Sequence, residues 1–327
     1  MTLVSSWEKA TEVSERVVPA HLDHPALLYG SLEEFVDGLA PYVATGIENG
    51  ETVFVAARGD YLPALRAEVG DAADAVWWAD TQEWHPHPST RLRAFYEFVV
   101  EELAAGATWI RLAGEPVWPV GQPELEREWQ RYESVLNAVL APFPVSLVCL
   151  YDARTLDASV LESAHCTHRV IRWHGKEVPS GAYVEPEDLL RRWSLQSPPP
   201  PSWASLMRIA SLEDLPAARR FLRERACLAD VGPDRSMDLS VATTEVLTNA
   251  LRHGGGDVRL FAWAESETFI CQVEDRGRGI IDPLAGYRPP LDEANGRGLW
   301  LARQLVDLLQ IVPGLQGTIV RLRVARS

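Results

Sequence analysis

The sequence predicts an α/β protein of two domains, the first built on a parallel sheet and the second of α+β type. The chain has 327 residues, which exceeds one typical domain. Strand-like and helix-like runs alternate through its first half, as they do in a parallel sheet covered on both faces. The charge also changes abruptly: the chain up to Trp203 holds 15 basic and 30 acidic residues, whereas the rest holds 16 of each.

A proline-rich segment coincides with this change in composition. Pro198 to Ser202 can neither continue a helix nor lie inside a sheet, because proline lacks an N–H group and fixes φ. We interpret the segment as a stiff polyproline II spacer. We therefore expect an N-terminal arm over residues 1–20, a first domain over 21–175, a connecting segment over 176–204 and a second domain over 205–327.

The composition argues against several classes of protein. A net charge of −15 disfavours a general nucleic-acid binder, which would carry a basic patch, so we expect no direct DNA binding. No run approaches the ~18–20 apolar residues of a membrane span, and residues 1–9 lack the apolar core of a signal peptide. Four scattered cysteines fit reduced thiols and not a disulfide framework. These features predict a cytoplasmic protein.

The first domain is expected to alternate strands with helices. Apolar runs predict strands at Ala26–Tyr29, Thr52–Ala57, Thr108–Ala113 and Val145–Tyr151. Helical spacing predicts helices at Leu32–Ala44, Tyr61–Val69 and Arg91–Leu103. The chain contains no phosphate-binding P-loop motif.

The second domain is expected to combine helices with strands of alternating polarity. Helical spacing predicts helices at Leu215–Leu228, Arg235–His253 and Leu299–Leu309. Alternation predicts strands at Val258–Ala264, Thr268–Glu274 and Gly317–Val324. A loop rich in proline and glycine, Asp282–Asn295, precedes the last of these helices.

Three short motifs stand out in the second domain. Glu245, Asn249 and Arg252 share one face of a predicted helix. The run Asp275-Arg276-Gly277-Arg278-Gly279 ends a predicted strand, and Gly296-Arg297-Gly298-Leu299 opens a predicted helix. Each motif alone is explained by a solvated face, an ordinary turn or a tight loop. Their order and spacing are the informative feature.

Together the motifs resemble the Bergerat nucleotide-binding fold of the GHKL superfamily, over about residues 206–325. Within that superfamily, the segments Ala242–Gly254 and Gly296–Arg303 are most similar to the anti-sigma-factor regulatory serine kinases. The resemblance implies a domain that binds ATP and Mg²⁺. It also implies that the loop over 282–295 is the ATP lid.

The same resemblance implies a role for each motif residue. Asn249 would hold Mg²⁺ through its carbonyl oxygen, since this ion prefers oxygen ligands, and Glu245 would be the general base. Asp275 would accept a hydrogen bond from the adenine amine, and Thr318 would line the adenine pocket. The other nucleotide-binding candidates lie beside the base, the sugar or the phosphates: Arg252, His253, Gly277, Gly279, Gly296, Arg297, Gly298 and Leu299.

The first domain resembles the MEDS sensory domain of bacterial regulators, over about residues 21–174. The resemblance is carried by short segments, namely His24, Leu28-Tyr29, Leu32-Glu33-Glu34-Phe35, Gly50-Glu51-Thr52-Val53, Gly114-Glu115-Pro116 and Leu150-Tyr151-Asp152-Ala153-Arg154. It implies a RecA-like core that has lost ATP binding and senses an unknown small-molecule signal.

Histidines in the first domain raise the question of a metal. Six of the eight histidines lie in pairs, His21 with His24, His85 with His87, and His165 with His168, and Cys166 lies inside the last pair. Such spacings can chelate zinc. No four-ligand pattern with structural-site spacing occurs, so ordinary hydrogen-bonding histidines are favoured over a metal or haem site.

The two resemblances imply a signal-transducing regulator whose sensory domain controls an ATP-dependent serine/threonine kinase. Such kinases bind a sigma factor and phosphorylate an antagonist protein of the STAS type, and their kinase domain is implied to form a homodimer. A sensor histidine kinase is an alternative, although the stretch from His174 to Ser205 is short and interrupted by prolines. A non-catalytic, ATP-gated protein-binding regulator is another, because the same residues would bind the nucleotide.

Overall fold

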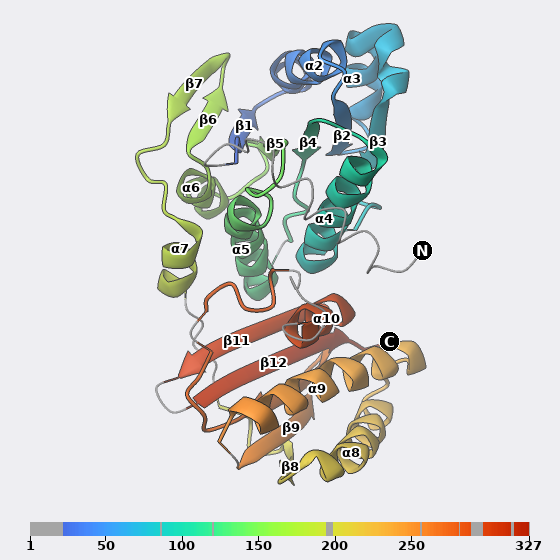
Figure 1. The fold of residues 1–327 in the computed structure, drawn as a ribbon, viewed down its shortest axis with the longest axis vertical. Helices are drawn as coiled ribbons and strands as arrows, with labels where there is room; N and C mark the ends of the chain where they lie inside the picture. Colours follow the sequence, from blue (N-terminus) through green and yellow to red (C-terminus); the bar gives the residue numbers. More distant parts are fainter. Residues whose placement is uncertain are drawn as a thin grey trace. The chain divides into compact units, whose positions relative to one another are not determined.

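The chain divides into two compact units, Met1–Leu189 and Leu190–Ser327 (Figure 1). The computed structural model describes residues 22–85, 87–119, 121–193, 199–255, 257–280, 282–288, 297–314 and 317–326. The N-terminal arm, Gly296 and half of the predicted lid (289–295) lie outside the described residues. The predicted α/β class is confirmed, with a mostly parallel sheet in the first unit and an antiparallel sheet with helices in the second.

The first unit is built on a seven-stranded sheet in the order β3-β2-β4-β5-β1-β6-β7. Its strands are β1 (Pro25–Tyr29), β2 (Thr52–Ala57), β3 (Val76–Asp80), β4 (Ile110–Gly114), β5 (Val145–Asp152), β6 (Val170–Trp173) and β7 (Lys176–Pro179). Every neighbouring pair is parallel except β6 with β7, which form an antiparallel hairpin. Strand β7 therefore extends this sheet within the segment that was expected to connect the domains.

Helices cover both faces of this sheet, as the alternation predicts. They are α2 (Leu32–Glu48), α3 (Leu62–Val69), α4 (Pro88–Ala105), α5 (Pro123–Val139) and α6 (Ala158–Thr167). The short helix α7 (Pro186–Arg192) follows β7 and spans the division between the two units. Val53 and Val55 of β2 belong to the core cluster that includes α2 and α3. Phe54, between them, packs against Phe95 and Phe98 of α4 on the opposite face.

The second unit has a five-stranded antiparallel sheet in the order β11-β12-β10-β9-β8. The strands are β8 (Ser205–Ile209), β9 (Val258–Ala264), β10 (Thr268–Glu274), β11 (Leu308–Gly314) and β12 (Gly317–Ala325). The helices are α8 (Leu215–Leu228), α9 (Pro233–His253) and α10 (Arg297–Leu305), and they pack on the sheet (Figure 1). Alternate residues of β12, Val320, Leu322 and Val324, lie in the core beneath them.

One predicted boundary is wrong. The helix expected to run to Leu309 ends at Leu305, and β11 begins at Leu308. Leu309 and Ile311 point into the core, and β11 pairs with β12 along its whole length. The apolar pattern of this segment is compatible with either a helix or a strand. It forms a strand because it pairs with β12.

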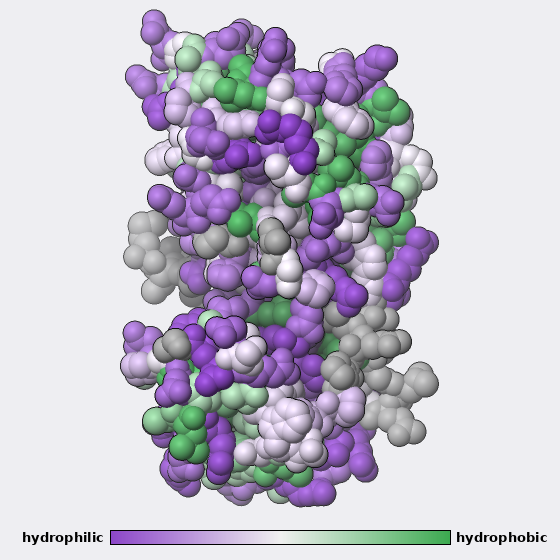
Figure 2. Space-filling view, turned by 180° about the vertical axis from the view of Figure 1, so that it is seen from behind, coloured by the Kyte–Doolittle hydropathy of each residue, from purple (hydrophilic) through white to green (hydrophobic). Residues whose placement is uncertain are grey.

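The described surface is mixed in polarity. Figure 2 shows one face, on which hydrophilic residues surround smaller apolar patches. Among the described residues, no helix combines the length and the apolar character that crossing a membrane requires.

Arg91, at the start of α4, organises the loop that follows β3. Its Nη1 donates to Thr81 Oγ1 (2.6 Å) and to the carbonyl oxygen of Glu115 (2.8 Å). Its Nη2 donates to the carbonyls of Thr81 and Trp84, both at 2.7 Å, and its Nε donates to the His85 carbonyl at 3.0 Å. The side chain is 1% exposed, and burial lowers its pKa from the usual value. The planar donor fork therefore replaces the water that these carbonyls would otherwise require.

We expect the change Arg91→Ala to lower the free energy of unfolding by about 3 kcal/mol or more, because several buried carbonyls lose their donor. Arg93→Ala is the matched control, since Arg93 lies on the same helix and forms only an exposed ion pair with Glu97. That control should cost about 0.5 kcal/mol or less. Denaturant unfolding followed by circular dichroism measures both; equal losses would contradict the role of Arg91.

Candidate functional site

The end of α9 lies directly against the end of β10. A Cβ atom on Gly277, just after β10, would lie 2.6 Å from the Cα of Gly254 and 2.6 Å from the His253 carbonyl oxygen. A Cβ on Gly254 would lie 2.6 Å from the Cβ of Asp275. Neither position has room for a side chain, so glycine at both allows the helix end and the strand end to touch.

Asp275 is held by the backbone on both sides of this contact. Its Oδ1 accepts hydrogen bonds from the N–H groups of Gly277 (2.8 Å) and Thr318 (3.3 Å). Its own N–H donates to the Thr318 carbonyl at 3.0 Å. These bonds fix the carboxylate and leave Oδ2 without a partner among the described residues. Asp275 is half-buried and Thr318 is buried.

Gly317 is a residue of this site that the sequence analysis did not assign. It begins β12 with φ of +133°, and a Cβ there would collide with the carbonyl oxygen of Asp275. Any side chain would push β12 away from the end of β10 and would strain the backbone. The only signal in the sequence is a glycine directly before the predicted Thr318.

Glu245 and Asn249 lie one turn apart on a half-buried face of α9, beside the start of α10. A Cβ on Gly298 would lie 2.9 Å from Glu245 Oε2 and 3.1 Å from Asn249 Nδ2. The first turn of α10 therefore approaches this acid–amide pair as closely as a glycine permits. The free N–H groups of a helix start make this a suitable place for anionic oxygens.

Residues 282–288, the first half of the predicted lid, are held against α10. Gly286 has φ of +76°, and its ideal Cβ position lies 3.1 Å from the Leu299 side chain. The buried guanidinium of Arg303 donates through Nε to the Gly286 carbonyl at 3.2 Å and lies 3.7 Å from the centroid of the Tyr287 ring. The base of the predicted lid is thus attached to the helix that bears Gly298.

The structure places the predicted site residues in two adjoining groups. Asp275, Gly277 and Thr318 form one group at the strand ends. Glu245, Asn249 and Gly298 form the other group, and α9 joins the two. The remaining candidates lie at the edges: Arg252 and His253 are exposed in the last turn of α9, Gly279 has φ of +77°, Arg297 is exposed, Leu299 packs against the core, and Gly296 lies outside the described residues.

Two protein-family models match the chain. Residues 23–169 match the MEthanogen/methylotroph, DcmR Sensory domain, MEDS, and residues 209–324 match the histidine kinase-like ATPase domain. The resemblances seen in the sequence are confirmed at this level, with a MEDS domain first and a GHKL-like ATPase domain second. A comparison with curated protein sequences found no match.

Solved structures resemble parts of the chain. The RsbU and RsbW domains of Rv1364c from Mycobacterium tuberculosis match at 22% identity over 38% of this chain and 33% of that chain, with a TM-score of 0.29. The Acinetobacter baumannii histidine kinase AdeS matches at 13% identity, over 43% of this chain and 73% of that chain (TM-score 0.24). The histidine kinase domain of the E. coli osmosensor EnvZ matches at 18% identity, over 38% and 89% (TM-score 0.24). The chain thus spans about a third of the length of the Mycobacterium tuberculosis protein chain.

We expect Gly317→Ala to lower the free energy of unfolding by about 2 kcal/mol or more, because the new methyl group meets backbone atoms at a positive φ. Gly181→Ala is the control, since an added Cβ there has nothing within 4 Å. Urea unfolding of the full chain compares the two variants. A Gly317→Ala protein as stable as the control would show that the close contact between β10 and β12 does not exist.

Proposed function

Because the chain joins a MEDS sensory domain to a histidine kinase-like ATPase domain, we propose that it is a regulator in which the sensory domain controls an ATP-dependent protein serine/threonine kinase. The single observation that carries the kinase proposal is the approach of Gly298 to Glu245 and Asn249. The proposal is supported because the side chains of Glu245 and Asn249, a possible general base and a possible metal ligand, lie beside the start of a helix. The motif resemblance to anti-sigma-factor serine kinases supplies the subtype.

The residues at this point fit a magnesium ion. The Asn249 amide and the Glu245 carboxylate are oxygen donors of the kind that Mg²⁺ takes, and the glycine at 298 keeps the space beside them free of a side chain. Asn249 would hold the ion. When bound, Mg²⁺ would neutralise part of the phosphate charge.

The other groups would bind the nucleotide and move one proton. Asp275 Oδ2 accepts a hydrogen bond from the adenine amine, with Thr318 beside it. Glu245 accepts the proton of an attacking serine or threonine hydroxyl, whose oxygen takes the γ-phosphoryl group while ADP leaves. The second unit contains no lysine. The negative charge of the phosphates would therefore be balanced by arginines such as Arg297 and Arg252 and by backbone N–H groups.

A serine kinase is favoured over a histidine kinase by the position of His174, the last histidine before the ATPase domain. His174 lies in the turn between β6 and β7 with φ of +50°, and its Nδ1 lies 2.9 Å from Glu34 Oε1. It is thus part of a sheet hairpin in the sensory unit, and not of a helical dimerisation hairpin. The proposed partners are accordingly a sigma factor and a STAS-type antagonist, and the ATPase domain would act as a homodimer.

We expect Asp275→Asn to weaken ATP binding by about tenfold or more, because the adenine amine loses a charged acceptor. Glu245→Gln should keep ATP affinity and lower phosphoryl transfer by ~10²–10⁴-fold, the usual contribution of a general base. Glu224→Gln, on an exposed position of α8, is the control. Calorimetric titration with ATP and transfer of labelled γ-phosphate to a purified STAS-domain protein measure the two effects.

The same assay separates the alternatives. Acid-stable phosphate on a partner serine or threonine supports the proposal. Acid-labile phosphate on a histidine of this chain would replace it with a histidine kinase. ATP binding with no transfer to any protein would leave a non-catalytic, ATP-gated regulator. Unchanged phosphoryl transfer by the Glu245→Gln variant would show that Glu245 is not the general base.

A further inference from the structure

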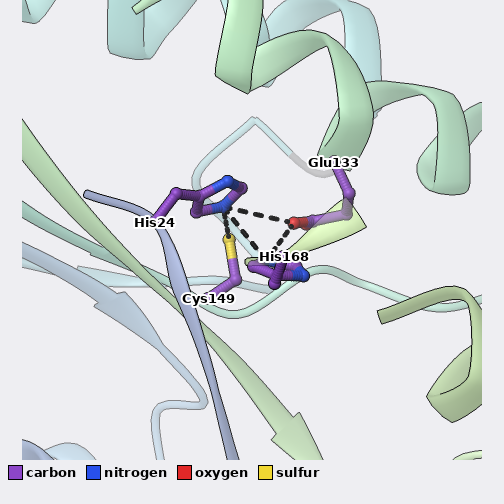
Figure 3. Close-up of side chains that lie close together, drawn as sticks. All are labelled: His24, Glu133, Cys149 and His168. Atoms are coloured by element: carbon purple, nitrogen blue, oxygen red, sulfur yellow. Dashed lines mark hydrogen bonds and ion pairs between the residues drawn. The ribbon is translucent and has the colours of Figure 1, made fainter. Parts of the chain in front are cut away.

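Four potential metal-binding side chains meet inside the first unit (Figure 3). We call them the four-donor cluster: His24, just before β1; Glu133 of α5; Cys149 of β5; and His168, which follows α6. All four are at most 4% exposed. They come from segments up to 144 residues apart, which the parallel sheet and its covering helices bring together.

The separations of the donor atoms suit one tetrahedral ion. His24 Nε2 lies 3.1 Å from Cys149 Sγ and 3.1 Å from His168 Nε2. Glu133 Oε2 lies 3.4 Å from His168 Nε2 and 3.7 Å from His24 Nε2. Zinc bond lengths place tetrahedral ligand atoms about 3.3 Å apart for two nitrogens and about 3.6 Å apart for nitrogen and sulfur.

Hydrogen bonds behind the imidazoles fix which nitrogen faces the centre. His24 Nδ1 lies 3.1 Å from Asn137 Oδ1, and Asn137 is oriented because its Nδ2 donates to the Thr167 carbonyl at 2.8 Å. His168 Nδ1 lies 2.9 Å from the Ala164 carbonyl oxygen, which can only accept. Both Nδ1 atoms therefore carry the proton, and both Nε2 atoms present lone pairs to the centre.

The neutral state of these rings is consistent with their surroundings. Burial, and then the neighbouring His168, lowers the pKa of His24 to about 3, and burial lowers that of His168 to about 4. Neutral imidazole is the form that ligates metal.

Within the cluster, the Cys149 thiol, 3.1 Å from His24 Nε2, is the one side chain that can donate into the centre when Glu133 is ionised. Two bare Nε2 atoms face each other at 3.1 Å. Neither oxygen of Glu133 accepts a hydrogen bond of normal geometry from the described residues. Buried polar groups left in this state cost free energy, whereas a cation between them would accept all the lone pairs at once.

We propose that the four-donor cluster is a closed binding site for a divalent transition-metal ion of the zinc type. Two imidazoles, a thiolate and a carboxylate are ligands that Zn²⁺ takes, and four protein ligands leave no open position for substrate. Asn137 and the Ala164 carbonyl act as the outer partners that orient ligating histidines. The ion would tie β1 and β5 to α5 and α6.

The test measures zinc in the purified full chain by elemental analysis and by competition with a chromophoric chelator. We expect one Zn²⁺ per chain. We also expect His168→Asn and Cys149→Ser each to weaken zinc binding by at least about tenfold. The matched controls are their neighbours on α6, His165→Asn and Cys166→Ser: His165 is exposed and Cys166 is half-exposed, so both controls should bind zinc as the unchanged protein does.

Cobalt substitution of the unchanged protein keeps the proposal testable if the cluster variants fail to fold. Tetrahedral Co²⁺ with a thiolate ligand should give intense visible bands and a sulfur-to-cobalt charge-transfer band in the near ultraviolet. The latter should persist in Cys166→Ser. A folded protein that takes up neither Zn²⁺ nor Co²⁺ in stoichiometric amount would show that protons alone satisfy the cluster. Equal loss of zinc in the cluster variants and the controls would also overturn the proposal.

Discussion

The candidate nucleotide site depends on one close approach, the contact between the end of α9 and the end of β10. It exists because Gly254 and Gly277 have no side chains, so helix and strand meet backbone to backbone. Helix α9 then sets the distance between the two parts of the candidate site. Asn249 lies five residues before Gly254. It is therefore about 7 Å, measured along the helix axis, from the end of α9 that contacts Asp275. The helix therefore sets the separation between Asp275 and the pair formed by Glu245 and Asn249.

Buried polar groups impose the corresponding constraint in the sensory unit. Arg91 meets this constraint with a single guanidinium, which donates to the loop after β3 and to the Glu115 carbonyl, so each of these partners is a protein group. The four-donor cluster is the opposite case, because two imidazole Nε2 atoms and a carboxylate face a centre in which only the Cys149 thiol can donate when Glu133 is ionised. The two solutions lie in the same unit, yet only the second calls for a group from outside the chain.

Local patterns were predictable from the sequence, and contacts between distant segments were not. Glu245 and Asn249 are one helical turn apart, so the helix alone brings them together. The four-donor cluster was not predictable, because its members lie far apart in the chain. Histidines were paired by closeness in the chain, but the structure unites His24 with His168 and leaves His165 exposed. Cys149 lies in an apolar strand and has the pattern of a core residue. The sequence alone does not fix the pairing of β1 with β5 and β6 that assembles the cluster.

Arg303 links α10 to the segments on either side of it in the chain. Its guanidinium binds the Gly286 carbonyl, contacts the Tyr287 ring and donates to the Leu309 carbonyl at 3.0 Å. The base of the lid, α10 and the start of β11 are therefore linked through one side chain. Because the first turn of α10 faces Glu245 and Asn249, a partner that displaces any of these three segments would also move one wall of the candidate nucleotide site. Control of an ATPase domain by a protein partner then needs no new contact with ATP itself, only a small shift of α10.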